Sequence, residues 1–85
     1  MKPTESQLGV LFRWFQWQMT SDKASKAMKW LENNATRKDV SDEISRVHDL
    51  YHNRKLDEER CFQSDIWQGF HYSEPLRPGG LLHGK

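Results

Sequence analysis

The sequence has a single cysteine, Cys61, among 85 residues. One cysteine excludes an internal disulfide and favours a reducing, cytoplasmic location. No apolar run approaches the roughly 20 residues that a transmembrane helix needs. The polar residues that follow Met1 also differ from the apolar stretch of a secretory signal peptide. We therefore expect a cytoplasmic protein that makes no contact with a membrane.

Excess charge of one sign is also missing, because the formal net charge is only +1. The charges are nevertheless unevenly distributed. Residues 1–38 include seven basic and three acidic residues, a net charge of +4, whereas residues 39–60 include four basic and seven acidic residues, a net charge of −3. A dipole of this kind can orient a partner, but it lacks the uniform positive charge of a dedicated nucleic-acid-binding protein.

Ten aromatic residues (four Trp, four Phe and two Tyr) are the most distinctive content of the chain. A domain of this length buries a smaller fraction of its surface than a large one does, so its core needs large side chains. Each aromatic ring can bury about 150 to 250 Å². The composition therefore predicts a folded domain with an aromatic-rich core.

Apolar residues recur at intervals of three and four in three stretches, which is the pattern of amphipathic helices. Thr4 and Gln7 have the spacing of a capping box, so we expect the first helix to begin there and to end near Met19. The second helix begins at residues 20–22, which are all good N-caps, and ends near residues 33–34. The apolar stripes are Leu8, Leu11, Phe12, Phe15 and Met19 in the first helix and Ala24, Ala27, Met28 and Leu31 in the second.

A third helix begins at either Thr36 or Ser41, since both residues can cap, and is expected to end at Asn53. Asp57 is the expected N-cap of a short helix over residues 58–62. The stripe of the third helix consists of Val40, Ile44, Val47 and Tyr51, with Leu50 on its flank.

Short and irregular structure follows the three long helices. We expect a turn over residues 65–68 that Gly69 ends, and then an aromatic extended segment over residues 70–72. Proline and glycine predict a flexible tail over residues 73–85. The fold expected is thus all-α: a single domain over residues 1–72, built as a compact bundle of three principal helices.

Candidate catalytic and metal-binding residues are few. His48 and His52 have a spacing that can chelate zinc, but Cys61 and His71 stand alone in separate segments, so we interpret the histidines as surface residues. Cys61 is expected to be a buried structural cysteine. Adjacent carboxylates such as Asp42 and Glu43 diverge on a helix and are expected to be solvated. A glycine-rich phosphate loop is missing. We predict no enzymatic activity, no cofactor and no small-molecule substrate.

The run from Ala35 to Ser41, followed by the run from Ile44 to Val47, resembles the A-x-x-x-G-V-S and V-S-R-V pattern of repressor-type helix-turn-helix domains. The resemblance covers about a dozen positions and implies DNA binding by the second and third helices. Asp39 stands where the family has its turn glycine, and one residue is missing before Ile44, which rotates the downstream stripe by about 100°. The basic residues that would contact nucleic acid are Lys23, Lys26, Lys29, Arg37 and Lys38.

The tryptophans suggest a different function. Trp14 and Trp17 fall opposite Leu8 on the first helix, and Trp30 lies off the stripe of the second helix beside two lysines. Either the C-terminal aromatic residues cover these rings or a partner does. We expect Trp30 to be the most exposed, and Trp14 and Trp17 to be covered.

The function that we favour is a non-enzymatic protein-interaction module, an adaptor or inhibitor that occupies a partner surface. Base rates for such short domains suggest an inhibitor encoded by a phage or mobile element, for example of the anti-CRISPR type. The alternative is a small helix-turn-helix-like DNA-binding regulator. The partner-binding residues expected are Trp30, Lys23, Lys26, Trp14, Trp17 and Arg13.

Overall fold

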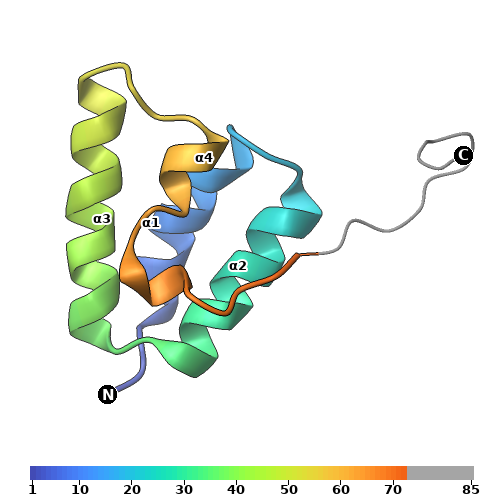
Figure 1. Cartoon of the computed structure of the whole chain (residues 1–85). Helices are drawn as coiled ribbons and strands as arrows, with labels where there is room; N and C mark the ends of the chain where they lie inside the picture. The colour runs from blue at the N-terminus through green and yellow to red at the C-terminus, as the bar shows by residue number, and fades with distance from the viewer. Residues whose placement is uncertain (73–85) are drawn as a thin grey trace, which may run out of the picture.

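The computed structural model describes residues 1–72 and shows that this part of the chain is helical, with no strand within it. The predicted all-α class and the three principal helices are confirmed (Figure 1). The expected flexible tail lies outside the described residues. No helix within residues 1–72 is long and apolar enough to cross a membrane. The elements are α1 (Glu5–Gln16), α2 (Ser21–Asn34), α3 (Arg37–His52), α4 (Glu58–Cys61) and the 3-10 turn η1 (Asp65–Trp67).

Threonine caps define where the three long helices begin. Thr4 and Gln7 form the predicted capping box of α1, and the Thr20 side chain accepts a hydrogen bond from the backbone of α2. α3 begins after Thr36 and not at Ser41, because Thr36 and Asp39 form a second capping box with N···O distances of 3.0 and 3.1 Å. α1 ends at Gln16, about three residues earlier than expected.

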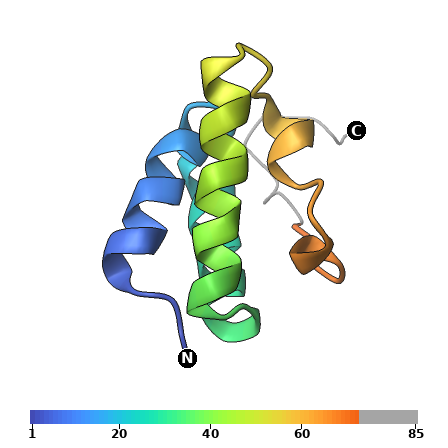
Figure 2. The ribbon, with the colours of Figure 1, turned by 90° about the vertical axis from the view of Figure 1, so that its left-hand side faces the viewer.

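The helix α1 packs against both α2 and α3. The chain after α3 makes contacts with all three of these helices. Figure 2 shows α1 on one side of α3 and this C-terminal segment, residues 57–72, on the other side. The C-terminal segment therefore covers the bundle from one side only. The side of α1 that faces away from it receives no cover from residues 57–72.

The core contains most of the residues expected from the three stripes, together with the buried Cys61 and Trp67 from the C-terminal segment. Tyr51 is a correction, because its side chain is 46% exposed although it continues the stripe of α3. Its position in the last turn of α3 places it beyond the end of the core. The buried apolar residues are Leu11, Phe15, Ala24, Ala27, Met28, Leu31, Val40, Val47, Cys61 and Trp67.

Glu43 is the one buried charged residue within residues 1–72, with 3% of its surface exposed, so the expectation that it is solvated is wrong. Its carboxylate accepts hydrogen bonds from Arg46 Nε at 2.9 Å and from Trp67 Nε1 at 2.8 Å. The hydroxyl of Ser64 donates to the same carboxylate. A buried charge is tolerated only when its hydrogen-bonding capacity is used, and these three donors provide that.

Arg46 extends this network from α3 to α4. Its guanidinium also donates to the carbonyl oxygens of Arg60 at 2.7 Å and of Cys61 at 2.8 Å. These carbonyls lie at the C-terminal end of α4, where helical backbone oxygens lack partners within the helix. One ion pair, Glu43 with Arg46, therefore joins α3 to both α4 and η1.

Replacement of Glu43 tests how much of the fold this network supports. We expect Glu43→Ala to lower the free energy of unfolding by about 3 kcal/mol, because it leaves the Arg46 guanidinium and the Trp67 indole without their acceptor. Urea denaturation followed by circular dichroism measures the loss. The neighbouring Asp42→Ala is the control: Asp42 makes an exposed ion pair with Lys38, so the cost should stay below about 0.5 kcal/mol. Equal losses for the two variants would contradict this account.

Candidate functional site

Five aromatic and imidazole rings gather on the surface formed by α1 and α3. The Trp14 ring lies 5.8 Å from the His48 ring and 6.4 Å from the Tyr51 ring, measured between centroids. The Trp17 ring lies 6.1 Å from Tyr51, and the rings of His48 and His52 are 4.2 Å apart. We call this set the aromatic patch: Trp14, Trp17, His48, Tyr51 and His52.

The aromatic patch is open to solvent at its centre. Trp17 is 56% exposed and Tyr51 is 46% exposed, and Val10, one turn before Trp14 on α1, is 42% exposed. Helical spacing explains the gathering, because residues three and four apart share a face of a helix. Arg13, which is exposed, precedes Trp17 by four residues and so flanks the patch.

The connections place the patch near the C-terminal ends of two helices. α2 runs opposite to α1 and α3, so the last turns of α1 and α3 lie at the same end of the bundle (Figure 1). Trp17 caps α1, and His52 is the last residue of α3. The partial negative charge at helix C-termini favours cationic groups nearby, such as Arg13.

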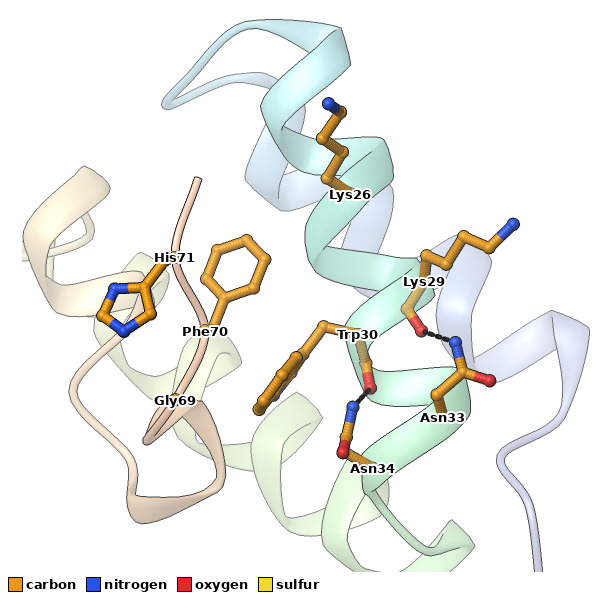
Figure 3. Close-up of a pocket in the computed structure, with 8 residues that line it drawn as sticks. All are labelled: Lys26, Lys29, Trp30, Asn33, Asn34, Gly69, Phe70 and His71. Atoms are coloured by element: carbon orange, nitrogen blue, oxygen red, sulfur yellow. Dashed lines mark hydrogen bonds between the residues drawn. The ribbon is translucent and has the colours of Figure 1, made fainter. Parts of the chain in front are cut away.

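A second surface is a groove of about 340 Å³ between α2 and the C-terminal segment (Figure 3). The α2 residues recur at offsets of three and four and so form one face of that helix. The opposite wall is the segment that follows η1. We call this groove the basic groove. Its lining residues are Lys26, Lys29, Trp30, Asn33, Asn34, Gly69, Phe70 and His71.

Trp30 holds the two walls of the basic groove together. Its indole Nε1 donates to the carbonyl oxygen of Ile66 at 2.9 Å, and its ring centroid lies 5.8 Å from that of Phe70. Gly69 has a φ of +91°, and a Cβ there would lie 3.2 Å from the Trp30 ring. Glycine is therefore required at this position both for the backbone conformation and for the close approach.

The expected order of tryptophan exposure is wrong. Trp30, expected to be the most exposed, is half-buried beneath Phe70, whereas Trp17, expected to be covered, is mainly exposed. The reason is the path of the C-terminal segment. Its rings pack against Trp30 and against Phe15, which lies 5.5 Å from Phe62, and not against the outward side of α1.

The predicted basic residues do not form one patch. Lys26 and Lys29 line the basic groove. Lys23, by contrast, forms an ion pair with Glu58, and its Nζ lies 5.5 Å from the centre of the Phe62 ring. Arg37 and Lys38 lie at the start of α3 and line a separate hollow. Lys23 therefore already makes contacts within the protein, whereas Lys26 and Lys29 make no ion pair within residues 1–72.

The segment that resembles a helix-turn-helix does not fold as one. The connection between α2 and α3 consists of Ala35 and Thr36 alone, shorter than the three or four residues of that turn. Asp39, which stands at the position of the turn glycine, is instead the third residue of α3 and caps it. The resemblance therefore does not extend to the backbone.

Sequence reasoning did not single out Tyr51, His48 and His52 as partner-binding residues. Tyr51 was assigned to the core because it continues an apolar stripe, and the histidines were assigned to the surface without a function. A usable signal is the position of Tyr51 near the end of α3. The last turn of a helix can extend beyond the helices that pack against it, so an apolar residue there can be exposed. The groove residues Asn33, Asn34, Phe70 and His71 carried no comparable signal.

Of the nucleophile and metal candidates, Cys61 lies apart from both surfaces, whereas His48 and His52 belong to the aromatic patch and His71 lines the basic groove. Cys61 is fully buried, as predicted, and burial raises the pKa of its thiol to about 12. No group of three or more His, Cys, Asp or Glu side chains within residues 1–72 is arranged to hold a metal ion.

Neither the protein-family models nor the curated proteins nor the solved structures contain a match to this chain.

The Cys61 thiol should be inert in the folded protein. At about pH 8 we expect almost no reaction with a disulfide reagent such as Ellman's reagent, because the thiol stays protonated and buried, and full reaction after unfolding in urea. Since the folded-state pKa of about 12 exceeds the ordinary value of 9.0, the contribution of Cys61 to stability is constant below pH 9 and falls as the pH rises toward 12. Rapid labelling of the native protein would contradict this assignment.

The tryptophans should differ in their accessibility to acrylamide. In three variants that each retain one tryptophan, with the others replaced by phenylalanine, we expect fluorescence quenching to be strongest for Trp17 and weaker for Trp30. Trp67, which is 5% exposed, should be the weakest and serves as the internal reference. Circular dichroism confirms that each variant is folded. A Trp30 that is quenched as strongly as Trp17 would contradict the packing against Phe70.

Proposed function

We propose that this protein is a non-enzymatic protein-interaction module that binds a partner protein through the aromatic patch. The observation that carries the proposal is the exposure of Trp17 and Tyr51, whose rings lie 6.1 Å apart, the first at the C-cap of α1 and the second on α3. Isolated exposed apolar residues are ordinary, but a contiguous group of large rings is the pattern of an interaction surface.

The residue types of the patch support a protein partner. Tryptophan, tyrosine and arginine dominate the binding energy of protein interfaces, and Arg13 lies beside the exposed Trp17. Each of these rings has an apolar body and a polar edge, so it can be exposed in the free protein and still contribute buried area in a complex.

Preorganisation of the patch also supports binding. Trp14 is half-buried and contacts both His48 and Tyr51, and Tyr51 contacts Trp17 and His52 in turn. Rings that already restrict one another lose less conformational freedom when a partner binds. Four of the five rings lie on helices and the fifth, Trp17, is the C-cap residue of α1, which holds the surface in one shape.

A non-enzymatic role agrees with the state of Cys61. A nucleophilic cysteine needs an accessible thiolate, whereas this thiol is buried and has a raised pKa. An adaptor or inhibitor role, including one encoded by a phage or mobile element, rests on chain length alone and stays a prediction.

The central prediction is that Trp17→Ala weakens partner binding by about 2 kcal/mol, roughly thirtyfold, while the fold is retained. Trp17 is largely exposed, so its removal opens no cavity in the core. Immobilised wild type and Trp17→Ala are compared in extracts of the source cell. A protein retained by wild type and lost by the variant is then purified, and its Kd for both is measured by calorimetry.

Two matched variants control this comparison. Trp17→Phe keeps a ring in the patch and should retain most of the affinity, whereas Lys38→Ala changes an exposed residue at the other end of α3 and should have no effect. If every retained protein binds wild type and Trp17→Ala equally, the aromatic patch is not the binding surface. A stable dimer of wild type that Trp17→Ala dissociates would show that the patch binds a second copy and would also refute the proposal.

A further inference from the structure

The basic groove combines positive charge with an apolar floor. None of its eight lining residues is acidic, and neither Lys26 nor Lys29 makes an ion pair within residues 1–72. Figure 3 shows both lysines on the α2 wall together with Trp30, and Phe70 on the facing wall. Two lysines, of which Lys26 has its Nζ 5.4 Å from the centre of the Tyr72 ring, and two aromatic rings therefore line the groove.

The groove also offers hydrogen-bonding groups of both kinds. The amide nitrogens of Asn33 and Asn34 donate to the carbonyl oxygens of Lys29 and Trp30 at 3.0 and 2.9 Å. Their Oδ1 atoms are therefore the groups left to accept from a ligand. On the facing wall, the backbone N–H groups of Gly69 and His71 make no hydrogen bond within the described residues and can donate.

This combination suits a peptide better than other anions. The main chain of an extended peptide presents alternating N–H and C=O groups, which match the asparagine acceptors and the backbone donors across the groove. Carboxylates match the lysines, and an apolar side chain can lie against Trp30 and Phe70. A nucleic acid carries a phosphate at every nucleotide and would find only two ammonium groups here.

We propose that the basic groove binds an extended acidic peptide segment that carries an aromatic or aliphatic side chain. The site is independent of the aromatic patch. It lies between α2 and the C-terminal segment, whereas the patch lies on α1 and α3. The groove can therefore bind its peptide whether or not the patch has a protein partner.

Titration with a defined probe tests the proposal by NMR. The probe is a peptide of about ten residues, all aspartate or glutamate except for one central phenylalanine, since an extended chain of that length exceeds a groove of this size. We expect it to shift the indole N–H resonance of Trp30 and the amide resonances of residues 69–71, and to leave the indole resonance of Trp17 unchanged. Affinity should fall severalfold between about 50 and about 200 mM salt, because exposed charges are screened.

Substitutions then separate the groove from general charge. The double variant Lys26→Gln and Lys29→Gln should weaken binding about tenfold or more while its NMR spectrum shows an intact fold, because both residues are exposed on α2. It also removes the contact of Lys26 Nζ with the Tyr72 ring, whose centre is 5.4 Å away. Lys38→Gln removes an exposed lysine from α3, one that is paired with Asp42, and should bind as wild type does. A peptide with the phenylalanine replaced by glutamate should bind severalfold more weakly.

Several results would overturn the proposal. It fails if the probe shifts no groove resonance, if Lys38→Gln weakens binding as much as the double variant, or if the peptide without phenylalanine binds equally well. It also fails if a single-stranded oligonucleotide of the same length shifts the Trp30 indole at lower concentrations than the peptide does. That result would assign the groove to nucleic acid.

Discussion

The buried carboxylate of Glu43 is the constraint on which the rest of the structure depends. A charge that is 3% exposed must satisfy its hydrogen bonds within the protein, and its donors come from Arg46, Ser64 and Trp67. Two of these three donors belong to the C-terminal segment. The network therefore fixes where residues 57–72 lie on the bundle, in addition to stabilising them.

The position of Trp67 in turn determines where the C-terminal wall of the basic groove meets Trp30 of α2. Its ring lies 5.7 Å from Phe15 in the core and 5.5 Å from Phe70, which continues to the ring of Trp30. This chain of contacts leads from a carboxylate on α3 to a surface formed by α2. The same path directs the C-terminal segment away from the outer side of α1, so Trp17 remains exposed.

The local structure could be predicted from the sequence, whereas the path of the C-terminal segment could not. Caps such as Thr4 and the periodicity of apolar residues depend on neighbours within one turn, and they placed the helices to within a few residues. The burial of Glu43 depends on Trp67, 24 residues away, and a carboxylate beside Asp42 has no local feature that distinguishes it from a solvated one. The same non-local contact determines which tryptophans are covered. The sequence therefore indicated that tryptophans form the candidate site, but not which of them are exposed.

The two surfaces depend on the buried network to different degrees. Every ring contact of the aromatic patch is made by residues of α1, its C-cap Trp17 or α3, and α1 packs directly on α3. The basic groove, by contrast, has one wall in the C-terminal segment, which the Glu43 carboxylate holds in place. Loss of that carboxylate would release one wall of the groove while leaving the helices that carry the patch.

A ligand in the groove should conversely stabilise the C-terminal segment, because a ligand that binds only the ordered state of this segment shifts the equilibrium toward that state. The groove thus depends on the hydrogen bonds of Glu43, whereas the patch depends on the packing of α1 against α3.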